Sequence, residues 1–112
     1  MNVFVRSTAR EDILRQFAWY LDVRDSPEIA RRFLDAVEVA IQKIADRPKI
    51  GAPKWLDNPK LKGLRSWPVP RFPAVRVYYL CSDDELRIVR VLHGKRDLQS
   101  ILQEDIPDED EQ

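Results

Sequence analysis

Two stretches in the first half of the chain carry apolar residues at helical spacing. In the first stretch the apolar positions are Ala9, Ile13, Phe17 and Tyr20. Thr8 and Glu11 have the spacing of a capping box, in which the hydroxyl accepts a free backbone N–H and the glutamate reaches back to the cap. The pattern therefore predicts a helix from Thr8 to near Asp22.

The second stretch has a stronger start signal. Ser26 is a favourable cap, and Pro27 suits the first helical position, where its missing N–H costs nothing. The apolar stripe that follows ends before Pro48 and consists of Ile29, Phe33, Ala36, Val37, Ala40, Ile41 and Ile44. Because few residues separate the two helices, we expect an antiparallel hairpin.

Alternating patterns predict strands at the start of the chain and in its second half. Residues 2–6 alternate around Val3 and Val5, which indicates a short opening strand. Residues 48–60 contain too many proline and turn-forming residues for a regular element and are predicted to be a loop. Three further strands, Lys62–Val69, Ala74–Cys81 and Leu86–His93, are separated by short turns. Together they predict an antiparallel meander.

The middle strand of the meander has two different faces. Val75, Val77 and Tyr79 alternate with Arg76, Tyr78 and Leu80, so the first, mostly apolar set is expected to receive the helices. Tyr78 and Tyr79 point to opposite faces, and spacing alone does not say which of them packs in the core and which stacks on a base or a partner.

The end of the chain changes character after the last predicted strand. Asp97 fits the cap of a short terminal helix over residues 97–103, and residues 104–112 form an acidic, proline-interrupted tail that is expected to be flexible. The predicted fold class is α+β. The expected organisation is one domain over residues 1–103, with an N-terminal strand, a helical hairpin, a three-stranded meander and the short helix.

The formal net charge of zero conceals an uneven distribution of charge. Six of the nineteen acidic residues lie in the last nine positions, so residues 1–103 carry nineteen Lys and Arg against thirteen acids, a net charge of +6. Such a basic body suits a polyanionic or acidic partner. The tail is interpreted either as a solvated end or as a segment that competes for the basic surface.

Several classes of protein are excluded by residue counts. The single cysteine, Cys81, has no intramolecular disulfide partner, and the chain opens without a signal-peptide pattern. No apolar run approaches the ~18–20 residues that span a bilayer. We therefore expect a cytoplasmic location and no membrane partner. One His and one Cys are too few for a usual metal site, and no phosphate-binding motif occurs, so no metal, cofactor or small-molecule substrate is expected.

Basic residues of the second half are candidates for a shared binding surface. Such a set binds phosphates or acidic side chains when it converges, and otherwise consists of ordinary solubilising charges. Trp55 lies among these residues and is either a loop anchor or a contact aromatic. The candidates for contact with a target or a partner are Lys54, Lys62, Arg65, Arg71, Arg90, Lys95 and Arg96.

His93 admits two interpretations. Its unperturbed pKa lies near neutrality, so a metal-free ribonuclease would use it for proton transfer, with Arg65 and Arg76 stabilising phosphate charge. Alternatively, His93 closes the last strand by hydrogen-bonding its turn.

Four motifs in order carry a family resemblance: Pro48-Lys49-Ile50-Gly51, the run from Leu61 to Trp67, Phe72-Pro73 followed by Val77-Tyr78-Tyr79, and the run from Arg90 to Asp97. Together they resemble the RelE/ParE superfamily of toxins from type II toxin–antitoxin pairs. The resemblance extends from Val3 to about Leu102. It implies a small α+β toxin that a cognate antitoxin neutralises by wrapping a segment around it.

The resemblance implies two different targets. RelE-like members cut mRNA on the ribosome without a metal, whereas ParE-like members poison DNA gyrase. This chain has no tyrosine after Tyr79 and no His-Tyr ending, so the usual proton-transfer candidates of the RelE branch are missing. The ParE-like branch is therefore favoured, and a ribosome-dependent endoribonuclease and an inactive antitoxin-binding member are the alternatives.

Overall fold

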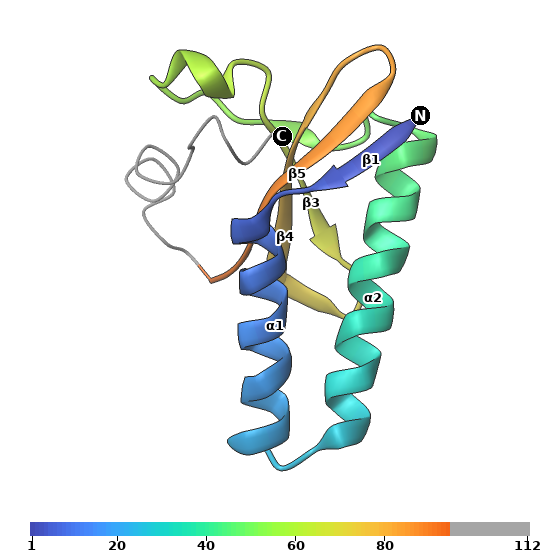
Figure 1. The fold of residues 1–112 in the computed structure, drawn as a ribbon, viewed down its shortest axis with the longest axis vertical. Coiled ribbons are helices and arrows are strands. Elements are labelled where there is room, and N and C mark those ends of the chain that lie inside the picture. The colour runs from blue at the N-terminus through green and yellow to red at the C-terminus, as the bar shows by residue number, and fades with distance from the viewer. Residues whose placement is uncertain (95–112) are drawn as a thin grey trace.

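A hairpin of two helices covers one face of a five-stranded sheet in the computed structural model, which describes residues 1–94 (Figure 1). The elements in chain order are β1 (Asn2–Val5), α1 (Ser7–Asp22), α2 (Pro27–Asp46), β2 (Ala52–Pro53), the 3-10 helix η1 (Pro59–Leu61), β3 (Arg65–Val69), β4 (Phe72–Cys81) and β5 (Glu85–His93). The predicted α+β class and the order of its strand, hairpin and meander are confirmed.

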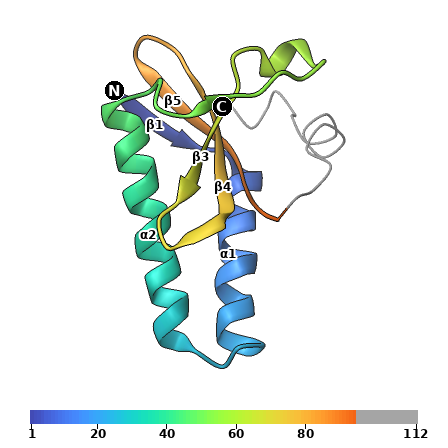
Figure 2. The same ribbon diagram turned by 180° about the vertical axis from the view of Figure 1, so that it is seen from behind.

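The last described strand lies in the interior of the sheet. The strand order is β1-β5-β4-β3-β2, with β1 parallel to β5 and the other neighbours antiparallel. Seen from behind, the sheet lies in front of the two helices (Figure 2). The opening strand is thus joined to the end of the meander, which places α1 beside the second half of β5.

The sheet buries both of its faces. The inner face packs on the helices and includes Val75, Val77 and Tyr79, as the alternation predicts. The outer face is covered by the segment before β3, whose Leu61 and Leu64 pack with Tyr78 in a second apolar cluster. Tyr78 is only 3% exposed, so both tyrosines of the pair are core residues and neither presents its ring to a partner. The meander is thus not the open basic surface that its charges suggest.

α2 begins as its sequence predicts. The Ser26 hydroxyl accepts the N–H of Ile29 at 3.2 Å, and Pro27 occupies the first turn. The buried side chains recur every three or four positions and are Ala30, Phe33, Val37, Ala40 and Ile44. Phe33 meets Phe72 of β4 at a ring separation of 5.4 Å, which fastens the helix to the sheet.

The capping box predicted for α1 is wrong. The helix begins at Ser7, its cap position is Arg6, and no side chain caps it. Thr8 lies inside the first turn and its hydroxyl donates to the carbonyl of Val89 on β5, at 3.4 Å. A tertiary hydrogen bond to the sheet has taken the place of the local bond that the Thr8–Glu11 spacing suggests.

The prediction of a plain loop over residues 48–60 also needs correction. Ala52 and Pro53 pair with the start of β3, and η1 is capped by Asn58, whose side chain accepts the N–H of Lys60 at 2.9 Å. β3 starts at Arg65 instead of Lys62, because the chain first turns at Gly63, which has a φ of 86°.

The short helix and acidic tail predicted after Lys95 lie outside the described residues, as does the proposed domain boundary at residue 103. Within residues 1–94, neither helix has the length and apolar character needed to cross a membrane.

Candidate functional site

A stripe of polar side chains on α1 completes the edge of β5. β1 ends at Val5, and the last backbone bond on this side joins the N–H of Arg6 to the carbonyl of Ile88. Beyond it, Asp12 accepts the N–H of Val91 at 3.0 Å and Gln16 donates to the carbonyl of Val91 at 2.9 Å. Side chains of the helix thus occupy the place of a neighbouring strand and satisfy the exposed backbone groups.

Asp12 also neutralises a buried arginine. Its two carboxylate oxygens lie 2.7 Å from Nε and 2.8 Å from Nη2 of Arg90, in a two-pronged pair. The Asp12 side chain is fully buried and that of Arg90 is 8% exposed. Arg90 was predicted to contact a target or an antitoxin, but its burial withdraws it from the surface and gives it a packing role. A bulge in β5 lies next to this pair, because Tyr78 pairs with Arg90 and Tyr79 with Ile88.

Sequence reasoning missed this pair because Asp12 stands in a helix rich in charged residues and reads as exposed. The signal that was present is the spacing of Thr8, Asp12 and Gln16, which puts three polar side chains on one helix face at intervals of four.

A second node fixes the turn after α2 to the sheet. The Tyr79 hydroxyl donates to the carbonyl of Pro48 at 2.7 Å and accepts the N–H of Gly51 at 2.9 Å. Arg65 donates to the carbonyl of Gly51 at 2.7 Å. A Cβ atom at Gly51 would lie 2.5 Å from the Tyr79 hydroxyl, so the close approach requires glycine. Burial raises the pKa of Tyr79 above its usual value, although the bond from Gly51 lowers it in part.

The structure does not bring the three nuclease candidates together. Arg65 lies opposite Tyr79 on the inner face, whereas Arg76 lies opposite Pro68 on the outer face, where its Nε donates to the Ser66 hydroxyl at 2.9 Å. His93 lies opposite Val75, four positions from Tyr79 along β4. Both arginines hold neighbouring groups of their own chain, which is a structural use of their charge.

His93 is exposed at the end of β5, where it borders a pocket of about 350 Å³ beside α1. The side chains that line it with His93 are Arg15, Gln16, Trp19 and Tyr20. No carboxylate is among the described residues that line this pocket. Among residues 1–94, the pocket therefore provides cationic and aromatic neighbours for His93 and no acidic group to orient its ring.

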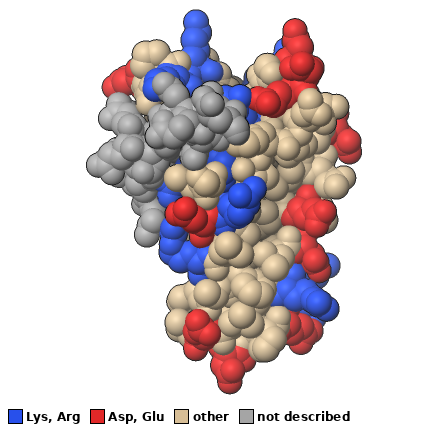
Figure 3. All heavy atoms as spheres, in the orientation of Figure 1, with Lys and Arg blue, Asp and Glu red and all other residues tan. Residues whose placement is uncertain are grey.

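Three of the predicted contact residues flank β3, at its two ends. Lys62 and Arg71 are exposed and Lys54 is half-buried. Lys54 and Lys62 precede β3, whereas Arg71 follows it in the turn to β4. Lys and Arg side chains stand out at the upper end in Figure 3, over the loop that Figure 1 draws before β3. Lys95 and Arg96 lie outside the described part of the chain.

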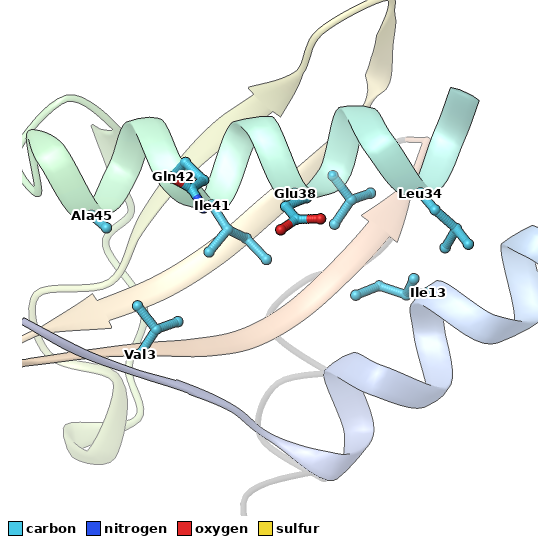
Figure 4. Close-up of a pocket in the computed structure, with 8 residues that line it drawn as sticks. Val3, Ile13, Leu34, Glu38, Ile41, Gln42 and Ala45 are labelled. Carbon is cyan, nitrogen blue, oxygen red and sulfur yellow. The ribbon is translucent and has the colours of Figure 1, made fainter. Parts of the chain in front are cut away.

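An apolar groove opens between β1 and the helical hairpin (Figure 4). Its volume is about 600 Å³, and Val3 on its sheet side is 45% exposed. Glu38 and Gln42 provide the polar atoms of its α2 wall, and the apolar lining consists of Val3, Ile13, Leu34, Val37, Ile41 and Ala45. The groove is a mostly apolar concave surface beside the free edge of β1.

Comparison with known proteins gives a family and a fold. A family model described as the ParE toxin of the parDE type II toxin–antitoxin system matches residues 3–98. A solved structure titled "Chromosomal ParDE TA system from P. aeruginosa" is similar with a TM-score of 0.68 and 18% identity. The match covers 85% of this chain and 97% of that chain. No curated protein matches.

Proposed function

Because this chain belongs to the ParE family of toxins of type II toxin–antitoxin systems, we propose that it inhibits growth by binding DNA gyrase and that a cognate antitoxin neutralises it. The family match over residues 3–98 is the observation that carries the proposal. The proposed site of action is the cytoplasm.

The proposed mode of action is binding without a chemical step. The separation of Arg65 and Arg76 on opposite faces of the sheet supports this, because a phosphate clamp needs its cations on one side of the reacting group. His93 borders no carboxylate among the described residues of its pocket. Apart from the buried Arg90, the residues predicted to contact the target stay part of the proposal, namely Lys54, Lys62, Arg65, Arg71, Lys95 and Arg96.

A purified sample tests the target directly. Added to a supercoiling reaction with a DNA-cleavage readout, the toxin is expected to inhibit gyrase and to trap cleaved DNA. The Arg96→Ala variant is expected to weaken this effect, whereas Arg32→Ala, an exposed arginine paired with Glu28 on α2, leaves it unchanged.

A cell-free translation reaction is the decisive counter-test. If the mRNA is cut at defined codon positions and gyrase activity is unchanged, the proposal is overturned in favour of the endoribonuclease. Loss of those cuts in His93→Ala would then assign proton transfer to His93. A chain that leaves both gyrase and the message unaffected while it binds its antitoxin would be the inactive member.

The antitoxin is proposed to place an apolar segment in the groove of Figure 4. The groove offers apolar side chains from β1, α1 and α2 within one concave surface, which suits an amphipathic segment. Val3→Glu puts a charge on this surface and is expected to weaken antitoxin binding roughly 10-fold or more.

Val39→Glu is the matched control, because Val39 is 47% exposed, close to the 45% of Val3, and does not line the groove. Titration calorimetry with the product of the neighbouring reading frame measures both variants, and growth rescue on co-expression provides a second readout. Equal affinities of the two variants would exclude the groove as the antitoxin site.

A further inference from the structure

Trp55 is 89% exposed, which is unusual for tryptophan, the residue with the largest apolar side chain. The segment around it is nevertheless held in place. Leu61 and Leu64 are at most 1% exposed beneath the loop. The backbone N–H of Lys54 donates to the carbonyl of Leu64 at 2.8 Å. The backbone next to Trp55 is therefore fastened to the fold, while the Trp55 ring stays in solvent.

Trp19 is the informative comparison within the same chain. It is 45% exposed, and its ring contacts Tyr20 at 5.2 Å and the guanidinium of Arg24 at 5.8 Å. Both contacts occupy ring surface. No aromatic or cation–π contact among residues 1–94 involves Trp55, so the faces of its ring are available to a ligand.

The surroundings of Trp55 are cationic. Residues 54–62 contain three lysines and a single acid, Asp57. Lys60 and Lys62 are exposed and Lys54 is half-buried. An exposed indole stacks on any nucleic-acid base, and ammonium groups beside it neutralise the phosphates that connect the bases. The carboxylates of an acidic peptide would pair with the lysines but offer no aromatic face to stack on the indole.

We propose that Trp55 and the lysines at positions 54, 60 and 62 form a binding site for single-stranded nucleic acid, in which Trp55 stacks on a base and the lysines contact phosphates. The site lies on the loop before β3, apart from the groove of Figure 4. It shares Lys54 and Lys62 with the proposed target contacts, but its test contains no gyrase, so failure of this proposal and failure of gyrase poisoning are distinguishable.

Binding of a fluorescent 12-nucleotide single-stranded oligonucleotide to the full-length chain provides the test. Trp55→Ala is expected to weaken binding roughly 10-fold, whereas Trp55→Phe, which keeps an aromatic ring, retains most of the affinity. Lys60→Gln with Lys62→Gln is expected to reduce the slope of log K against log salt by about 1.4, which corresponds to two phosphate contacts.

The controls are residues of the same type elsewhere on the molecule. Trp19→Ala and Lys43→Gln, both on the helices, are expected to leave affinity and salt slope unchanged. Because Trp55 is almost fully exposed, its variants should keep the wild-type melting temperature, so lost binding does not reflect unfolding.

Four outcomes would overturn the proposal. The first is unchanged binding in Trp55→Ala, and the second is an equal loss in Trp19→Ala. The third is displacement of the oligonucleotide by poly-glutamate of the same charge as effectively as by unlabelled oligonucleotide, which would identify a general acid-binding surface. Tighter binding of a duplex than of the single strand would exclude base stacking as the mode of recognition.

Discussion

A buried carboxylate in a small domain must be neutralised, and Arg90 neutralises that of Asp12. The same carboxylate also accepts the N–H of Val91, so one side chain satisfies two groups of β5. Removing one partner of such a pair leaves a charge in the interior without compensation, which costs far more than the pair itself contributes.

Asp12→Asn is therefore expected to lower the free energy of unfolding by about 3–5 kcal/mol. Asp22→Asn, at the exposed end of the same helix, should change it by less than about 0.5 kcal/mol. Urea denaturation followed by circular dichroism measures both. Combining Asp12→Asn with Arg90→Met should cost less than the two single changes together, and strict additivity would show that the pair is not coupled.

Tyr79 gives the fold a dependence on high pH. Its hydroxyl must stay protonated to donate to Pro48, and burial raises its pKa above the usual value. From about pH 10 upward the unfolded chain loses a proton that the folded chain retains, so the stability due to Tyr79 is complete below that pH and decreases above it.

Tyr79→Phe should lower the free energy of unfolding at neutral pH by about 1–3 kcal/mol, because the carbonyl of Pro48 and the N–H of Gly51 lose their partner. Above about pH 10 the difference in stability between wild type and variant should become smaller. Melting temperatures of the two proteins from pH 7 to pH 11 measure this. A difference that stays constant over the whole range would contradict the role given to the hydroxyl.

At the scale of elements, the two helices show what sequence patterns can predict. α2 has a local cap, and local signals predicted its start because the bond from Ile29 to Ser26 lies within one turn. The start of α1 was misassigned because Thr8 bonds to Val89, which is 81 residues away. Local spacing contains no information about a partner at that distance.

Ser26→Ala is expected to destabilise the protein by about 1 kcal/mol, which is typical for the loss of a cap. Thr8→Ala should cost less, since its bond to Val89 is long at 3.4 Å and no helix start depends on it. Thermal melts of the two variants compare them. A larger loss of stability in Thr8→Ala than in Ser26→Ala would favour a capping role for Thr8 and contradict the weak tertiary hydrogen bond assigned to it.

The meander and the candidate site were likewise predicted only where the signal is local in sequence. Alternation predicted β1, β4 and β5 and the face that packs on the helices, because burial follows the pleat. Proline content concealed β2 and η1, which are stabilised by pairing with β3 and by the Asn58 cap. The charge count placed Arg90 on the surface, because composition does not show that Asp12 lies beside it.

The whole molecule combines a basic body with an acidic end. Residues 104–112 contain six acids, and residues 1–103 have a formal charge of +6. Removing residues 104–112 should raise the salt concentration at which the protein elutes from heparin, because six negative charges no longer oppose the polyanion. A full-length variant with all six acids changed to their amides should elute at the same salt concentration as the truncated protein. An unchanged elution point in both would show that the tail does not influence the basic surface.

The interior position of β5 has a consequence for the timing of synthesis. A chain emerges from the ribosome with its N-terminus first. β1 therefore has no strand beside it until residues 85–88 have been made, and Asp12 has only the exposed Arg15 of its own helix as a partner until Arg90 has been made. Products of a message cut short before that point lack the strand that joins the two halves of the sheet. We expect such fragments to be harmless to the cell and readily degraded, so that toxicity begins only when translation of the chain is nearly complete.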